Sequence, residues 1–557
     1  MKEGNKEQRE CRIGKLFNFR PLFFTAVFLC FGIYFYYQYH FNGVSAVWLL
    51  LLLPIGLTPF CFCRTRIQAR KTALAVLLLG VSFMVGFFGF FIQLTNYMSV
   101  QERTEKCYVR GHVAETREYA SSFGVVLDGV IIGEEWVNGK LIAYLDTSYA
   151  ENISLSDEVL LTGRVQPFAW EEGEFVFSAK SVGKDIRYEM YGDSACVTGR
   201  PFHLFLRLRA HAQETISVGM DETPAAVTRA VLFGDTYGIE EALYENIRMG
   251  GIAHIFAVSG LHVGALYRAC LWLSKKTALK KMPVGTTFLL VAAVLVIYAG
   301  ICGFSASVVR ATVICLSSYL LSLLWSKSDF LQALGLAAIV VLLFTPSALF
   351  EVGFQLSFVA CLGLAFLRKP IRQVCDYGYF LWEKVFPIRR TEAQLLLLAE
   401  GDTLPPTIRE RVYRTTASLF ATTMSAQIAT APLLLYYFGY LSGWALLLNC
   451  VFVPIVTAFF SVLLAFVAIA CLLPSVCSLV VLYLPNLVWS GLLLLFEAVD
   501  FSSFALTGVS VSGGAIVLYC TGWLFLTDKW NIDKRLKYLL SAVGFLSFGV
   551  AMVALNL

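Results

Sequence analysis

The sequence predicts an α-helical polytopic membrane protein with about 11–14 transmembrane helices and a small extracytoplasmic β-barrel insert that is OB-like. Of its 557 residues, 57% are hydrophobic and only 15% are charged, and the mean hydropathy is +0.68. Many apolar runs reach the length that a helix needs to span a bilayer. The segment 98–200 differs, because it breaks into short runs typical of β-strands.

The N-terminal segment, 1–97, is predicted to cross the membrane three times, through the runs 21–38, 46–62 and 73–95. Basic residues crowd the first 20 positions and the loop 64–71, and short basic loops favour the cytoplasm. The first apolar run lacks a small-residue cleavage site, which favours a retained helix over a signal peptide. We therefore expect a cytoplasmic N-terminus, with 98–200 on the outer side of the membrane.

The outer segment offers five strand-like runs between 107 and 190, and an oligonucleotide/oligosaccharide-binding (OB) barrel is the leading candidate fold. It carries 17 Asp or Glu against 10 Lys or Arg, a balance that repels phosphates. Contact with nucleic acid and a purely structural role both stay open. Cys107 and Cys196, the two cysteines of this segment, bracket the barrel in an oxidising compartment and predict a disulfide.

The segment 201–250 is predicted to form amphipathic interface helices. The run 201–218 mixes Leu and Phe with Arg, as a helix lying on the membrane surface does. Asp221 or Thr223 is a candidate N-cap with Pro224 at the first helical position, and Gly250 is a candidate helix stop.

The remainder divides into a transmembrane domain, 251–500, and C-terminal transmembrane helices, 501–557. Three more basic segments, 274–281, 368–414 and 528–537, are expected to be cytoplasmic loops. The helices are expected at 251–273, 284–301, 304–325, 330–346, 350–367, 417–440, 444–471, 476–498, 511–527 and 538–555. The run 444–471 is long enough for a break near Pro454.

Polar residues interrupt the apolar stretch GIAHIFAVSGLHVGAL at 251–266. On a continuous helix His254, Ser259 and His262 would share one broad face. Gly260 could instead break the helix or allow close helix contact. Because polar groups are costly at membrane depth, these residues either line a polar cavity or hydrogen-bond within the bundle. A serine peptidase is a weaker alternative, since no carboxylate lies nearby to orient a histidine.

Further polar residues lie in other apolar segments. Arg310 is a few residues inside a hydrophobic run, Glu351 and Gln355 are one helical turn apart, and Gln427 precedes Pro432. Such a set favours a polar interior over a sealed one. Arg310 suits phosphate as a partner, although Glu351 could equally neutralise it.

In this order, the segments FGDTYGIE (233–240), GIAHIFAVSGLHVGAL, YAGICGFSASVVRAT, GFQLSF and SAQIATAPLLLYYFGYL resemble the competence domain of the ComEC family over roughly 225–500. The outer insert also resembles that family's amino-terminal barrel. The resemblance implies an inner-membrane channel that takes up single-stranded DNA during natural transformation. It assigns the channel-motif positions to Asp235, His254, Ser259, Gly260, His262, Arg310 and Gln355.

Longer family members often end in a metallo-β-lactamase-like domain. The six histidines here lie at 40, 112, 203, 211, 254 and 262, so this stretch of sequence is not expected to hold that metal site. No cofactor, metal or catalytic residue is expected, and the phosphate-binding loop of an ATP motor is missing from the sequence. Expected partners are single-stranded DNA, the lipid bilayer, a DNA receptor, a cytoplasmic motor ATPase, a separate nuclease and a second copy of the chain. A transporter of another solute built on the same bundle is the main alternative.

Overall fold

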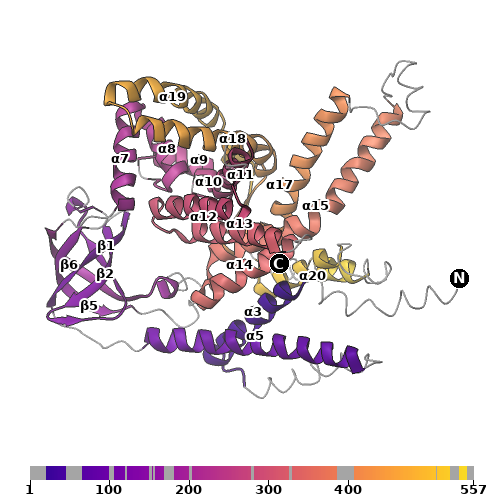
Figure 1. The fold of residues 1–557 in the computed structure, drawn as a ribbon, viewed down its shortest axis with the longest axis horizontal. Helices are drawn as coiled ribbons and strands as arrows, with labels where there is room; N and C mark the ends of the chain where they lie inside the picture. Colours follow the sequence, from indigo (N-terminus) through magenta and orange to yellow (C-terminus); the bar gives the residue numbers. More distant parts are fainter. Residues whose placement is uncertain are drawn as a thin grey trace. The chain divides into compact units, whose positions relative to one another are not determined.

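The computed structural model describes most of the chain as helices, with one barrel of strands (Figure 1). The described residues are 20–45, 66–98, 106–118, 122–149, 153–154, 157–168, 181–199, 204–236, 238–256, 258–276, 282–324, 329–385, 407–509, 511–526 and 539–548. They form two compact units. The first unit contains the described residues of 1–218, 266–355 and 467–478, and the second contains those of 219–265, 356–466 and 479–557.

Eight described helices are long and apolar enough to cross a membrane, so the chain is a multi-pass membrane protein. In the first unit these are α3 (Pro21–Phe41), α5 (Arg66–Met98, with Thr72–Met98 as its apolar part), α12 (Val284–Ile301) and α13 (Ala306–Leu324). The others are α15 (Val352–Val385), α17 (Ile408–Phe438), α18 (Ala445–Ala470) and α19 (Ser475–Glu497). α14 (Phe330–Phe344) and α20 (Gly513–Leu526) are shorter apolar helices.

Small residues let the helices of the first unit approach closely. A Cβ on Gly32 of α3 would lie 2.0 Å from the Phe83 carbonyl oxygen of α5, and one on Gly86 would lie 2.2 Å from that of Leu29. Such backbone-to-backbone contact needs glycine on both helices. α14 packs on the other side of α3, where the Leu22 amide donates to Gln332 Oε1 at 3.1 Å.

The barrel is OB-like and closed by five strands. They are β1 (Lys106–Glu118), β2 (Phe123–Ile132), β4 (Lys140–Leu145), β5 (Glu158–Pro167) and β6 (Ile186–Gly199). The order β1-β5-β6-β4-β2 closes through a β1–β2 pairing, and β4 and β6 are the parallel pair. The short strand β3 (Glu135–Trp136) extends β2. Alternating residues such as Val125, Leu127, Leu141, Leu161 and Met190 fill the interior.

The predicted bond between Cys107 and Cys196 is wrong. Cys107 on β1 pairs with Gly163, whereas Cys196 on β6 pairs with Leu160, so the two cysteines lie on opposite sides of β5. Two strand spacings of about 4.8 Å already exceed the reach of a disulfide, which needs Cα atoms within about 7 Å. The thiols are therefore not bonded to each other.

The barrel is attached to α5 through strand β6. Tyr97 of α5 donates its hydroxyl to the Ile186 carbonyl at 2.5 Å, and Arg187 donates to the Asn96 carbonyl at 2.6 Å. Outside the barrel, Val126, Ile142 and Ile186 form a second small buried cluster. This part of the β2–β4 face, where OB folds often bind ligands, is thus packed.

A surface ion pair lies at the other side of the barrel. Arg110 Nε on β1 donates to Glu158 Oε1 on β5 at 2.7 Å. This hydrogen bond, assisted by the charge of the guanidinium, holds the pKa of Glu158 below its usual range. The pair is exposed, so it fixes strand register more than it stabilises the fold.

The second unit joins its apolar helices to three short ones. These are α8 (Glu222–Phe233), α9 (Glu241–Met249) and α10 (Ala253–Phe256). Asp221 is the N-cap of α8 and Gly250 the C-cap of α9, as two of the sequence signals predicted. Pro224 is the third helical residue and not the first, because α8 begins at Glu222. α8 is buried over most of its length, so it is a core helix and not a surface connector. The strands β7 (Tyr440–Ser442) and β8 (Ala505–Thr507) form a small ribbon in the same unit.

Several predicted helices match the structure, and two are longer than predicted. α12 has the predicted bounds, and α18 runs through Pro454 without a break. α15 and α17 extend well into 368–414, which the sequence reading treated as a loop, so that reading is wrong for 368–385 and 408–414. The predicted helix 46–62 lies outside the described residues, as does the basic segment 528–537.

Candidate channel-lining site

The stretch 251–266 is a broken helix and not a continuous one. α10 ends at Phe256, and α11 (Gly260–Lys276) begins after a break that contains Val258 and Ser259. Gly251 precedes α10 with a φ of +73°, and a Cβ there would lie 2.6 Å from the Cβ of Ala445. Both the backbone conformation and the close packing therefore require glycine at this position.

Ser259 and His262 form the N-terminal cap of α11. The Ser259 carbonyl accepts from the His262 amide at 3.1 Å, and the Ser259 amide donates to His262 Nδ1 at 3.3 Å. This is one half of a capping box: histidine, in place of the usual Glu or Gln at the third helical position, accepts from the N-cap amide, whereas the Ser259 hydroxyl does not accept from the His262 amide. The sequence spacing Ser-x-x-His therefore serves the helix terminus directly.

His262 is buried, with 1% of its surface exposed, and its ring stacks on Phe460 of α18 at 4.7 Å between centroids. Ser259 Oγ is also buried and has no hydrogen-bond partner among the described residues. Because His262 Nδ1 faces the Ser259 amide and not its hydroxyl, this geometry does not form a serine–histidine nucleophile pair.

The other motif residues of the second unit lie on adjacent segments with different exposure. Asp235 is half-buried and directly follows Gly234, the left-handed C-cap of α8. A Cβ on Gly234 would lie 3.2 Å from Val258 Cγ2, so the end of α8 adjoins the break before α11. His254 on α10 is exposed, as is Gly260. The predicted continuous helix that would carry both His254 and His262 is therefore not formed, and the two histidines lie on separate helices.

Arg310 belongs to the first unit and is the fifth residue of α13. It is 6% exposed, and its Nη1 lies 3.8 Å from Glu351 Oε2, which is an ion pair too long for a hydrogen bond. Its Nε has no hydrogen-bond partner among the described residues. The guanidinium also lies against Gly353, where a Cβ would be 3.1 Å from Nη2. Arg310 therefore retains an N–H group, inside an apolar helix, that can donate a hydrogen bond to a further acceptor.

Gln355 lies on α15 in the same unit. Its Nε2 donates to the Leu349 carbonyl at 3.0 Å, across the turn of η5 (Pro346–Phe350) that leads into α15. Glu351 sits between this turn and Arg310. The structure therefore brings Arg310 and Gln355 to the same helix start, while the remaining five motif residues belong to the second unit.

The sequence analysis missed Asn449 as part of the second unit's polar set. Asn449 on α18 is 8% exposed, its Nδ2 lies 3.5 Å from the Gly251 carbonyl, and its Oδ1 has no partner in the described part of the chain. The signal was available, since an asparagine inside the apolar run 444–471 carries the cost of a buried amide.

Each unit holds polar groups that suit a polar substrate. In the first unit, Arg310 offers a buried cation for an anion. In the second unit, Ser259 Oγ and Asn449 Oδ1 are buried oxygens without hydrogen-bond partners among the described residues. A polar group in an apolar environment costs free energy unless it is satisfied, so each of these residues is expensive to maintain as packing alone.

Comparison with known proteins gives a family match over residues 231–531, described as competence protein. ComE operon protein 3 of Bacillus subtilis (strain 168) is 26% identical over 252 residues, which cover 45% of this chain and 27% of the relative. The uncharacterized protein MG316 homolog of Mycoplasma pneumoniae is 32% identical over 131 residues, which cover 23% of this chain and 32% of the relative. The chain thus spans about a third or less of the length of these curated relatives.

A polytopic helical membrane protein with an OB-like barrel and buried polar residues is the class that the fold and the site define. The family match covers more than half of this chain, including the broken helix and the α15 start. The chain belongs to the competence protein family, in agreement with the resemblance to ComEC in its motifs.

Proposed function

We propose that this chain is the inner-membrane channel through which single-stranded DNA enters the cytoplasm during natural transformation. The observation that carries the proposal is the competence family match over 231–531, a range that holds all seven motif positions. The likeness to ComE operon protein 3, named for a competence operon, supports the same role.

The buried cation supports this cargo. Each nucleotide of a DNA strand carries one negative phosphate, and Arg is the side chain best suited to a planar, multidentate phosphate contact. Arg310 has a loosely placed carboxylate beside it, so a phosphate could share or replace Glu351. A neutral solute would have no comparable use for a buried guanidinium.

Orientation and partners are part of the proposal. The basic residues of 1–20, 64–71 and 368–414 favour a cytoplasmic N-terminus, which places the barrel outside the bacterial cytoplasmic membrane. The chain then works without catalysis of its own. A receptor delivers DNA, a separate nuclease degrades the second strand and a cytoplasmic ATPase supplies the energy.

Deleting the gene should abolish the entry of end-labelled DNA into a nuclease-protected pool, while binding of the same DNA at the cell surface stays unchanged. Re-expression of the chain should restore entry. The physical reason is that a channel acts after capture, so its loss separates the two steps. Normal entry in the deletion strain would contradict the proposal, and loss of another solute's uptake alone would favour the transporter.

A further inference from the structure

The helices α15 and α17 are much longer than a membrane requires. At a rise of about 1.5 Å per residue, 34 residues span about 51 Å, whereas the hydrocarbon core is about 30 Å thick. α17 has 31 residues and begins with a capping box between Thr407 and Glu410. The parts of both helices beyond the apolar span, 368–385 and 408–418, are named the arm here.

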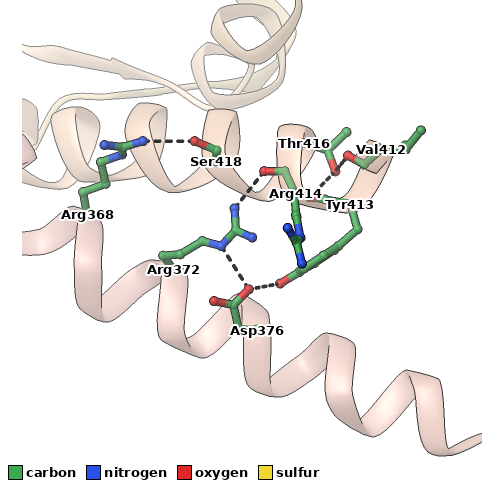
Figure 2. A network of polar contacts seen from close by, with 8 residues as sticks. All are labelled: Arg368, Arg372, Asp376, Val412, Tyr413, Arg414, Thr416 and Ser418. Atoms are coloured by element: carbon green, nitrogen blue, oxygen red, sulfur yellow. Dashed lines mark hydrogen bonds and ion pairs between the residues drawn. The ribbon is translucent and has the colours of Figure 1, made fainter. Parts of the chain in front are cut away.

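A polar and aromatic network joins the two helices of the arm (Figure 2). Asp376 accepts from Arg372 Nε at 3.0 Å and from the Tyr413 hydroxyl at 2.6 Å. Arg372 also donates to the Arg414 carbonyl at 2.8 Å, so α15 is tied to the α17 backbone as well as to its side chains.

Ring contacts continue this network toward the tip. Tyr379 and Tyr413 stack with centroids 3.9 Å apart and planes 16° apart. The Arg409 guanidinium lies 3.9 Å from the centre of the Trp382 ring, the distance of a strong cation–π contact. One stacked tyrosine pair, one cation–π contact and one carboxylate therefore fix the spacing of the two helices of the arm.

The outer surface of the arm is basic and aromatic. Its described residues include seven Lys or Arg against three Asp or Glu. α15 is exposed at most positions of the arm, so its side chains are accessible around much of the helix. The exposed residues that carry a cation, an amide or an aromatic ring at helical spacing are Lys369, Gln373, Tyr377, Phe380 and Lys384. On α17, Arg411 and Arg414 are exposed one turn apart.

We propose that this arm binds the phosphate backbone and bases of single-stranded DNA at the cytoplasmic mouth of the channel. The inference rests on the proposed function. Charge complementarity selects the ligand, since sequence-independent strand binding combines cations along the backbone with aromatic faces for the bases. Tyr377, 65% exposed and lying between Lys369 and Lys384, provides such a face.

Anionic lipid is the competing ligand, and distance disfavours it at the tip. If the span begins at Val352 and uses about 20 residues, Lys384 lies about 20 Å beyond the hydrocarbon edge. The Debye length at physiological salt is about 8 Å, so headgroup charges are screened there. Lys384 and Arg411 therefore distinguish the two ligands better than Lys369 does.

The test replaces Lys384 and Arg411 together by glutamine, because both are exposed and lie outside the network of Figure 2. The full chain in phosphatidylcholine nanodiscs is titrated with a fluorescent oligothymidine at several salt concentrations. Each lost single-strand phosphate contact should reduce the slope of log K against log salt by about 0.7, so the variant should lose about 1.4. The matched control, Lys384→Arg with Arg411→Lys, should keep the wild-type slope.

Unchanged slope and affinity in the glutamine variant would overturn the arm's role. So would a difference that arises only when phosphatidylglycerol is added to the nanodiscs, since the arm would then bind lipid. If wild-type chain fails to bind the oligonucleotide and the deletion strain still takes up DNA, the proposed function fails first. If the wild-type chain binds the oligonucleotide and gene deletion abolishes DNA entry, then an unchanged slope in the glutamine variant contradicts only the role of the arm.

Discussion

Replacing Arg310 by methionine should lower the free energy of unfolding by about 3–5 kcal/mol, because it leaves a buried carboxylate without its cation. The Glu351 side chain is 13% exposed, so water restores little of the lost interaction. Thermal unfolding of the purified chain measures the effect. DNA entry should also be lost in cells.

A double variant separates the structural and transport roles of Arg310. Arg310→Met combined with Glu351→Gln removes both charges, and stability should recover toward wild type while DNA entry stays absent. The single variant Glu351→Gln serves as the control and should retain entry, since Arg310 remains. Full DNA entry in the stable double variant would mean that Arg310 has only a structural role in the bundle, and it would contradict a phosphate contact at this residue.

Replacing His262 by phenylalanine should cost about 1–3 kcal/mol, because the Ser259 amide loses its acceptor. The ring still stacks on Phe460, so the loss isolates the cap. His262→Gln should be better tolerated, since glutamine at the third helical position accepts the same N–H. Unfolding of both variants in one detergent makes the comparison.

Equal stability of the phenylalanine and glutamine variants would contradict the capping role. DNA entry adds a second readout. At matched abundance, His262→Gln should retain most entry if the residue positions the break before α11. Complete loss with a stable His262→Gln protein would instead require the imidazole itself in the DNA path.

The membrane class and most helices were predictable because apolar run length is a direct consequence of bilayer thickness. α12 was predicted over 284–301 and occupies Val284–Ile301. The four strand runs from 107 to 165 correspond to β1, β2, β4 and β5, since alternation and turn residues are local signals.

Features that depend on long-range arrangement were not predictable. The Cys107–Cys196 bond failed because strand order, which places β5 between the two cysteines, is not written in local sequence. The arm was predicted to be a loop because the apolar run of residues ends at the charged residue Arg368. Its start was nevertheless readable, since Thr407 and Glu410 have the spacing of a capping box.

The motif site was predicted in composition but not in geometry. The sequence identified Ser259 and His262 as polar residues that are costly in an apolar segment. The predicted continuous helix would have placed both side chains on one face. The structure instead uses the pair at a helix terminus, because the break after Phe256 exposes backbone amides that require capping.

The most direct test of passage through this chain is photo-crosslinking during uptake. A photoreactive amino acid replaces Gln355 beside the Arg310 pair, and a second strain carries it at Val296, an exposed apolar position of α12. Cells are given end-labelled DNA and irradiated while the strand enters. If DNA passes beside Arg310, we expect the labelled DNA to crosslink to the chain that carries the photoreactive residue at position 355 and not to the chain that carries it at 296. Entry of DNA without label at 355, or equal label at both positions, would contradict it.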